Sequence, residues 1–359
     1  MSLDLFSPTN LGSIALKNRM VMAPLTRNRA GDSGVPQALN TNYYEQRASA
    51  GLIITEATPI SAMGHGYPAL PGIYTDAPMV GWKKIVDAVH AKGGKIVLQL
   101  WHVGRISHPS LLPDNALPVA PSAIKPAGKA FTYNGLVDYL APRALDLNEL
   151  PNIVQDYVHA TKCSIQAGFD GVEIHAANGY LLDQFLRDGS NKRTDNYGGS
   201  LENRSRLLMD VTQAVVNVIG ADKVGVRLSP SNPFNDMHDS DAQALFDHVT
   251  QQLNQFNLAY LHVVEGGIAG GGEAKAFDFE QMRQLFKGAY MANLGYDKAR
   301  GNAAIASGFA DCVAYGVPFI ANPDLVERYQ TNAPLNEADS ETFYGGTEKG
   351  YTDYPFLTT

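Results

Sequence analysis

The chain has 359 residues, of which 45% are hydrophobic and 18% charged, a composition typical of globular proteins. Its formal net charge is -8, with 28 Lys and Arg against 36 Asp and Glu, which disfavours binding to nucleic acid or to an anionic membrane surface. Two average domains would fit this length, but α/β barrels of this size commonly form one domain, so we expect one domain over residues 1–359.

The cysteines and the N-terminal residues indicate which cofactors and which cellular compartment to expect. Cys163 and Cys312 lie in apolar stretches, where buried structural thiols are expected, and two cysteines are too few to hold an iron–sulfur cluster. The first residues have neither the basic nor the apolar part of a secretory signal, and no apolar stretch is long enough to span a bilayer. We therefore expect a cytoplasmic protein.

Short apolar runs rich in β-branched residues alternate along the chain with longer stretches of helical periodicity. This order is typical of repeated βα units and a parallel sheet covered on both faces. The runs predict strands at residues 20–24, 52–57, 95–101, 171–176, 224–230, 260–265, 288–294 and 311–316. Eight such units favour a single closed (β/α)8 TIM barrel over a doubly wound sheet.

The stretches between the strands predict helices and loops. Helices are expected at residues 78–91, 147–167, 201–219, 239–256 and 297–307, and glycines follow the first three, as is common after a helix end. Residues 5–19 indicate an N-terminal β-hairpin that could plug the barrel floor. The insertions 102–144 and 266–277 are too long for simple connections and should cap the active face.

Polar side chains interrupt the apolar runs near the carboxyl ends of the predicted strands. The first strand leads into Thr26, the third carries Gln99 and the fifth carries Arg227, while the fourth leads into the run 175–180. Each alone could simply satisfy buried backbone groups. Because barrel enzymes place their chemistry at the carboxyl ends of the strands, their convergence on one face predicts an active site.

The run 175–180 has the groups needed to reduce an enone. His175 and Asn178, three residues apart, can both donate hydrogen bonds to one carbonyl oxygen. Tyr180 has an ordinary pKa of about 10, so it is protonated at neutral pH and can act as a general acid. A metal-ligand role for His175 is disfavoured because no second ligand follows at the helical spacing, and we expect no metal. A buried tyrosine without these neighbours would be read as structural.

Other polar residues at this face suit a flavin. Arg227 is a permanent cation that suits the negative charge of a reduced flavin, Gln99 can hydrogen-bond its pyrimidine edge, and Thr26 can reach a ring oxygen. The glycine-rich run 266–272 lacks the spacing of a dinucleotide fingerprint and is better read as a loop. A phosphate cradle is expected instead at Gly295 and Tyr296, ahead of a helix, with Gly316 beside it.

These stretches together resemble the Old Yellow Enzyme family, in particular members such as N-ethylmaleimide reductase and 12-oxophytodienoate reductase. The resemblance runs nearly end to end and includes residues 22–27, 99–105, 175–180, 193–204 and 320–325. So many long motifs in the same order make the match specific.

The resemblance implies an ene-reductase with bound, non-covalent FMN and with NADPH or NADH as reductant, working in a ping-pong cycle on enones, enals and maleimides. It implies that His175 and Asn178 bind the substrate carbonyl and that Tyr180 is the proton donor. The implied FMN contacts are Pro24, Leu25, Thr26, Ala57, Gln99, Arg227, Gly295, Tyr296, Gly316 and Val317. Tyr67, Trp101 and Tyr351 match positions that shape the substrate pocket.

One position departs from the family pattern. Val317 stands where members usually carry an arginine that clamps the FMN phosphate. Backbone N–H groups, or a substitute cation among Arg300, Lys298 and Lys287, would have to hold the phosphate, and weaker FMN retention is expected.

Three alternatives stay open at this point. The same reduced flavin could serve a nitro or nitrate-ester reductase or an NADPH oxidase. A flavin-binding sensor without turnover would not need a proton donor, and a barrel that binds no cofactor would not be yellow. The physiological substrate, the choice between NADPH and NADH and the oligomeric state, monomer or weak homodimer, do not follow from the sequence.

Overall fold

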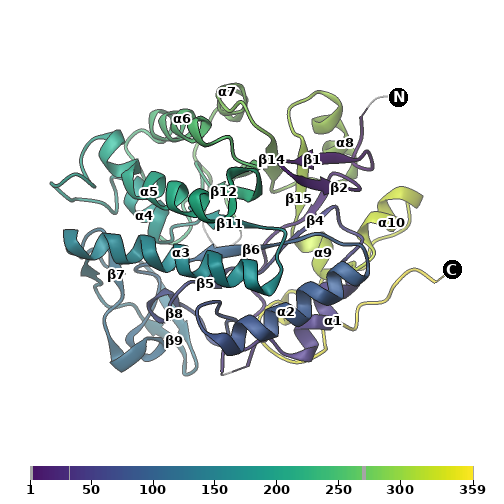
Figure 1. Cartoon of the computed structure of the whole chain (residues 1–359), viewed down its shortest axis with the longest axis horizontal. Coiled ribbons are helices and arrows are strands. Elements are labelled where there is room, and N and C mark those ends of the chain that lie inside the picture. The colour runs from purple at the N-terminus through teal and green to yellow at the C-terminus, as the bar shows by residue number, and fades with distance from the viewer. Residues whose placement is uncertain (1–2, 32, 269–271, 359) are drawn as a thin grey trace.

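The computed structural model describes residues 3–31, 33–268 and 272–358, and within them eight parallel strands close into a barrel (Figure 1). The barrel strands are β3 (Met20–Met22), β4 (Leu52–Ile54), β6 (Ile96–Trp101), β11 (Gly171–His175), β12 (Val224–Leu228), β13 (Tyr260–Val264), β14 (Tyr290–Asn293) and β15 (Cys312–Tyr315). The last strand pairs with the first, with Tyr315 opposite Met22. The prediction of a TIM barrel is confirmed, with each strand within its predicted range.

Successive side chains of each strand point to opposite sides of the barrel wall. In β11, Val172 and Ile174 point outward and join the large core under the helices, whereas Glu173 and His175 point inward. Parallel register places Glu173 beside Gln99 of β6 and His175 beside Arg227 of β12. The inward positions near the carboxyl ends are therefore polar.

Helices surround the barrel (Figure 1). They are α1 (Ala38–Gln46), α2 (Asp76–Ala91), α3 (Leu150–Ala167), α4 (Leu181–Leu186), α5 (Leu201–Ile219), α6 (Ala242–Leu253), α7 (Phe279–Leu285), α8 (Lys298–Ala306), α9 (Val317–Ala321) and α10 (Leu325–Thr331). The five predicted helices correspond to α2, α3, α5, α6 and α8. The other five were not predicted, and four of them have seven residues or fewer. No helix of the described ranges is long and apolar enough to cross a bilayer.

The N-terminal hairpin closes one end of the barrel. It consists of β1 (Thr9–Leu11) and β2 (Ile14–Leu16), paired antiparallel. Gly12 turns between them at φ +56°, and a Cβ there would lie 2.1 Å from the Asp222 carbonyl oxygen, just before β12. The inward side chains Leu11 and Ile14 are buried against the apolar lower barrel interior. The predicted plug of the barrel floor is confirmed.

The first insertion forms a small cap at the opposite end. It contains β8 (Lys129–Thr132) and β9 (Gly135–Asp138), an antiparallel hairpin, and β7 (Val119–Ala120) paired with β10 (Arg143–Ala144). A further short strand, β5 (Thr58–Pro59), extends the barrel wall beside β6. Ala130 and Tyr139 pack in one cluster with Trp101 and Tyr180, so this insertion covers the carboxyl ends of β6 and β11, as expected.

The second insertion is only partly described, since residues 269–271 lie outside the described ranges. Its flanks contact the loop after β12: the Ile268 N–H donates to Asn232 Oδ1 at 3.4 Å and the Lys275 N–H to the Ser231 carbonyl at 3.2 Å. It therefore also lies at the carboxyl end of the barrel.

The C-terminal segment is fastened to the loop that follows β3. Arg27 donates to the carbonyl oxygens of Phe343 and Gly350, each at 2.8 Å. Arg29 donates to the carbonyl oxygens of Thr342 and Thr347 at 2.8 and 3.1 Å. Arginine side chains thus satisfy backbone groups of a segment that forms no sheet ladder.

Candidate active site

His175 is the last residue of β11 and is buried. Its Nδ1 accepts a hydrogen bond from the Ala177 N–H at 3.3 Å. Burial, with the positive charge of Arg227 second, lowers the pKa of His175 well below its ordinary value. The ring is therefore neutral near pH 7, and because Nδ1 accepts, Nε2 carries the proton and is available as a donor.

Asn178 follows in the left-handed conformation, φ +57°, which Asn tolerates better than most residues. Its backbone N–H donates to Ser229 Oγ at 2.7 Å, and its Oδ1 accepts from Asn232 Nδ2 at 2.9 Å. Since the amide oxygen is committed to Asn232, the Asn178 NH2 group is the side that can donate to a ligand. Ser229 and Asn232, both just after β12, were not singled out from the sequence.

Tyr180 is packed among aromatic rings. Its ring stands edge-on to Trp101, with centroids 4.8 Å apart, and to His175 at 5.1 Å. Its hydroxyl lies 3.2 Å from the Tyr67 hydroxyl, and Tyr67 stacks on Trp101. Burial raises the pKa of Tyr180 to about 12, so the hydroxyl keeps its proton at neutral pH. The structure thus brings His175, Asn178, Tyr180, Trp101 and Tyr67 together.

Below this group, the barrel interior carries polar atoms without partners. Gln99 Nε2 donates to Glu173 Oε1 at 2.7 Å, while Gln99 Oε1 is buried and has no hydrogen-bond partner within the described ranges. Arg227 Nη2 donates to Asn293 Oδ1 at 2.9 Å, and Arg227 Nε is likewise unpaired among the described residues. Unpaired buried polar atoms cost free energy and often mark a site completed by a ligand.

Residues from other strand ends border the same region. Pro24, Leu25 and Thr26, after β3, are half-buried, and Ala57, after β4, packs in the cluster of Trp101 and Tyr180. A Cβ added at Gly316, after β15, would lie 3.4 Å from the Leu25 side chain. Apolar contacts from two strand ends and unpaired polar atoms from two others fit a flat ring with a polar edge.

The region where the FMN phosphate is expected offers fewer polar groups to a ligand. Gly295 has φ +70°, and its carbonyl accepts from Arg300 Nη1 at 3.0 Å. The Arg300 guanidinium stacks over the Tyr296 ring, 4.0 Å from its centroid, so Arg300 is a cation beside this loop. Val317 is exposed and provides no charge.

The other two substitute cations are placed differently. Lys298, the first residue of α8, donates to Asn332 Oδ1 after α10. Lys287 precedes β14, which puts it at the amino end of the barrel, opposite the phosphate loop. The suggestion of Lys287 as a phosphate ligand was therefore wrong.

The expectation for Tyr351 also needs correction. Tyr351 is buried and stacks on Tyr43 with centroids 4.1 Å apart, the Arg29 guanidinium lies 4.5 Å from its ring centroid, and its hydroxyl accepts from Asn40 Nδ2 at 2.9 Å, so protein groups occupy both the ring and the hydroxyl. Tyr344 in the same segment is 63% exposed. Burial is the main cause that raises the pKa of Tyr67 and of Tyr180, and Tyr344 adds to both shifts, which indicates that Tyr344 lies near these two hydroxyls.

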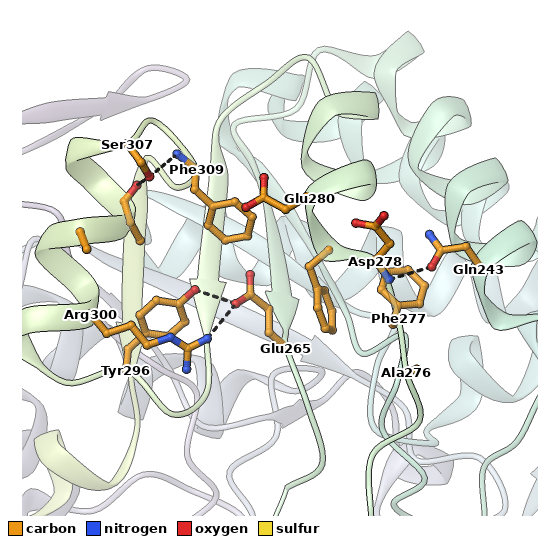
Figure 2. A pocket seen from close by; sticks show the side chains of 13 residues that line it. Gln243, Glu265, Ala276, Phe277, Asp278, Glu280, Tyr296, Arg300, Ser307 and Phe309 are labelled. Carbon is orange, nitrogen blue, oxygen red and sulfur yellow. Dashed lines mark hydrogen bonds and ion pairs between the residues drawn. The ribbon is translucent and has the colours of Figure 1, made fainter.

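A separate cleft of about 970 Å³ lies between α7 and α8 (Figure 2). Its lining includes Phe277, Phe309 and Glu265, whose carboxylate accepts from the hydroxyls of Tyr290 and Tyr296 at 2.9 and 2.7 Å. Two of its lining residues were named from the sequence: Tyr296, as an FMN contact, and Arg300, as a substitute cation. Because the Glu265 carboxylate is already paired with two tyrosine hydroxyls, it is less available to a ligand than the polar side chains at the carboxyl end of the barrel.

The comparisons with known proteins agree with this geometry. Residues 4–336 match the model of the NADH:flavin oxidoreductase / NADH oxidase family. The chain is 46% identical over 363 residues to 12-oxophytodienoate reductase 1 of Oryza sativa subsp. japonica, covering 99% of this chain and 94% of the relative. It is also 46% identical over 361 residues to putative 12-oxophytodienoate reductase 11 of the same plant, covering 98% and 97%.

Solved structures give the same result. Morphinone reductase superposes with a TM-score of 0.95 at 49% identity, covering 99% of this chain and 97% of that one. An old yellow enzyme homologue from Zymomonas mobilis superposes with a TM-score of 0.95 at 44% identity, covering 99% and 100%. The fold and site define a flavin-dependent oxidoreductase, and the chain belongs to the NADH:flavin oxidoreductase / NADH oxidase family, as an enzyme of the Old Yellow Enzyme type. FMN and a reduced nicotinamide are its cofactors, as expected.

Proposed function

We propose that this enzyme reduces the activated C=C bond of α,β-unsaturated carbonyl compounds, such as enones, enals and maleimides, in a ping-pong cycle with NADPH or NADH. The observation that carries the proposal is the arrangement of three donors at the end of β11: His175 Nε2–H, the Asn178 NH2 group and the Tyr180 hydroxyl. A protein that only binds a flavin has no need of this set.

The residues at the carboxyl ends of the strands fit the isoalloxazine ring of FMN. Pro24, Leu25, Thr26 and Ala57 would contact its faces and edges, while Gln99 and Arg227 offer buried unpaired polar atoms to its pyrimidine side. Gly295, Tyr296, Gly316 and Val317 would border the phosphate, with Arg300 as the nearby cation. When bound, FMN accepts hydride from the nicotinamide and supplies hydride to the substrate.

His175 and Asn178 would hold the substrate carbonyl oxygen. Both donors are fixed before the substrate binds, His175 by the Ala177 N–H and Asn178 by Ser229 and Asn232. Fixed donors stabilise the negative charge that develops on an oxygen without reorganising during the reaction. The neutral state of His175 keeps it a hydrogen-bond donor rather than an acid.

Tyr180 would donate the proton to Cα as hydride reaches Cβ. Its hydroxyl is protonated across the physiological range and lies against Tyr67, which can support it by a hydrogen bond. Trp101, Tyr67 and the exposed Tyr344 would limit the size of the substrate. This role for Tyr344 replaces the one expected for Tyr351.

The experiment that tests this function separates the two half-reactions. Tyr180→Phe removes the hydroxyl and should slow reduction of 2-cyclohexenone by about 10² to 10⁴-fold, while reduction of the bound flavin by NADPH stays within about threefold of wild type. Stopped-flow absorbance measures both steps. Tyr133→Phe, at an exposed tyrosine of the cap, is the matched control. Equal loss in both half-reactions would remove Tyr180 as proton donor, and nitroglycerin turned over faster than the enone would favour a nitrate-ester reductase.

A further inference from the structure

A buried carboxylate lies directly below the proposed site and has no role in the function described so far. Glu173 is 0% exposed and precedes His175 by two residues on the inner face of β11. Its Oε1 accepts from Gln99 Nε2 at 2.7 Å, and its Oε2 lies 2.9 Å from His262 Nδ1. The carboxylate therefore joins three strands, β6, β11 and β13, inside the barrel.

The surrounding groups keep this carboxylate charged. Burial alone would raise the pKa of Glu173, but the hydrogen bonds from His262 and Gln99 and the positive charge of Arg227 outweigh it, so the pKa lies below its ordinary value. Burial also lowers the pKa of His262, which leaves that ring neutral, with the Nδ1 proton directed at Glu173. Glu173 is thus a fixed negative charge inside the barrel, with Arg227 as the facing cation.

This carboxylate decides how the Gln99 amide is turned. A side-chain amide can present either its oxygen or its NH2 group in a given direction. An ionised carboxylate only accepts hydrogen bonds, so it selects the Gln99 NH2 group and leaves Gln99 Oε1 as the unpaired atom. An unpaired buried acceptor is satisfied by a hydrogen-bond donor, and the pyrimidine ring of a flavin carries one, an N–H between two carbonyl groups.

The charge has a second consequence. Reduction places negative charge on the flavin ring, and a fixed anion nearby opposes it in a region of low dielectric constant. Arg227 acts in the opposite direction. The charges of Glu173 and Arg227 together therefore set how readily the bound flavin accepts electrons.

We propose that Glu173 is a positioning residue for FMN: it turns the Gln99 carbonyl oxygen toward the flavin N–H, and its charge lowers the reduction potential of the bound flavin. The proposal rests on the proposed contact of Gln99 with the ring. It does not depend on how the enone is bound, so the two can fail separately.

Two substitutions separate the charge from the positioning. Glu173→Gln keeps the size and an acceptor for Gln99 but removes the charge. It should shift the two-electron reduction equilibrium of bound FMN about tenfold toward the reduced form, which corresponds to about 30 mV, with FMN affinity within about threefold of wild type. Glu173→Asp keeps the charge but shortens the side chain. It should leave the potential near that of wild type and weaken FMN binding about tenfold, because Gln99 is no longer held.

The potential is measured by equilibration with a reference dye, and the FMN dissociation constant by flavin fluorescence. Asp324→Asn is the matched control, since Asp324 is a buried carboxylate paired with Arg328 on α10, away from the barrel interior. It should match wild type in both measurements.

An unchanged potential in Glu173→Gln, unchanged affinity in Glu173→Asp, or the same shifts in Asp324→Asn would each overturn the proposal. Should Glu173→Gln fail to fold, Gln99→Leu in the native background decides the positioning part: its FMN affinity should fall by the same factor as in Glu173→Asp, and unchanged affinity would overturn it. None of these readouts uses enone turnover, so a wrong assignment of His175 or Tyr180 leaves them unaffected.

Discussion

The two ends of the barrel use the same eight strands in opposite ways. At the floor, inward side chains of the barrel strands such as Val97 are apolar, and Leu11 and Ile14 of the β1–β2 hairpin are buried against them. Toward the mouth, the inward positions carry Gln99 and Arg227, and each has a buried polar atom without a partner in the described ranges. The floor is packed mainly by apolar side chains, whereas the mouth carries polar atoms that a ligand can pair, so stability and chemistry are separated along the barrel axis.

The largest effect on enone reduction should come from removing the two side chains proposed to bind the substrate oxygen. His175→Ala combined with Asn178→Ala should lower the rate of enone reduction by about 10³-fold or more, since one such donor contributes about 10² to 10³-fold. The same variant should lose the long-wavelength charge-transfer band that a bound phenol gives with oxidised flavin. Absorbance titration with a phenol checks this, and a surviving band would contradict the oxygen-pair assignment.

A substitution at the floor of the barrel should instead lower stability and leave catalysis nearly unchanged. Leu11→Ala removes a fully buried side chain beneath the barrel and should cost about 2 to 5 kcal/mol of unfolding free energy, the usual range for such a deletion. Enone kinetics below the unfolding transition should stay within about twofold of wild type. Denaturant unfolding and stopped-flow kinetics measure the two quantities. A tenfold loss of enone reduction in a folded variant would show that floor and mouth are coupled.

A smaller effect is expected at the phosphate end of the mouth. Val317→Arg places a cation at an exposed position beside Gly316 and should tighten FMN binding about tenfold, near the lower end for a charge-assisted hydrogen bond. Val317→Gln, of comparable reach without the charge, is the control. Fluorescence titration of the apoprotein with FMN measures the change, and equal affinity in Val317→Arg and wild type would count against the expected weak retention.

The smallest effect is expected from pH. In the proposed mechanism Tyr180 acts in its protonated form, and its pKa of about 12 means that this form is lost only as pH rises toward that value. In the same proposal His175 acts in its neutral form, and because its pKa lies well below the ordinary value, protonation removes that form only in acid. The enone half-reaction should therefore be flat from about pH 6 to about pH 9. An inflection near pH 6.5 in single-turnover rates would show that His175 titrates there.

The sequence predicted the barrel better than the details of its mouth. The eight apolar runs located every barrel strand because burial on both faces of the wall demands β-branched residues. Helices with a broad apolar face, such as α5, were predicted to the residue, whereas α1 has no such face and α4 is six residues long. Short helices of this kind depend on tertiary contacts more than on their own periodicity.

At the site, polar residues that interrupt apolar runs were recognised from the sequence, whereas their hydrogen-bond partners in loops that meet them only on folding were missed. His175, Asn178 and Tyr180 share one run, but Asn232 meets Asn178 only because β12 lies beside β11. Glu173 carried a signal that could have been used: it alternates with Val172 and Ile174 in the same way as His175. Tyr351 was misplaced because two tyrosines occur seven residues apart in a segment without periodicity, and only packing distinguishes them.

The hydrogen bonds from Arg27 and Arg29, in the loop after β3, to the C-terminal segment have a consequence for folding during translation. Arg27 and Arg29 lie early in the sequence, and their acceptors at residues 342–350 lie 313 to 323 residues further along. The loop that carries Thr26 therefore gains these partners only after residues 342–350 have left the ribosome. A nascent chain arrested after β15 could close its barrel and still lack a finished flavin cradle.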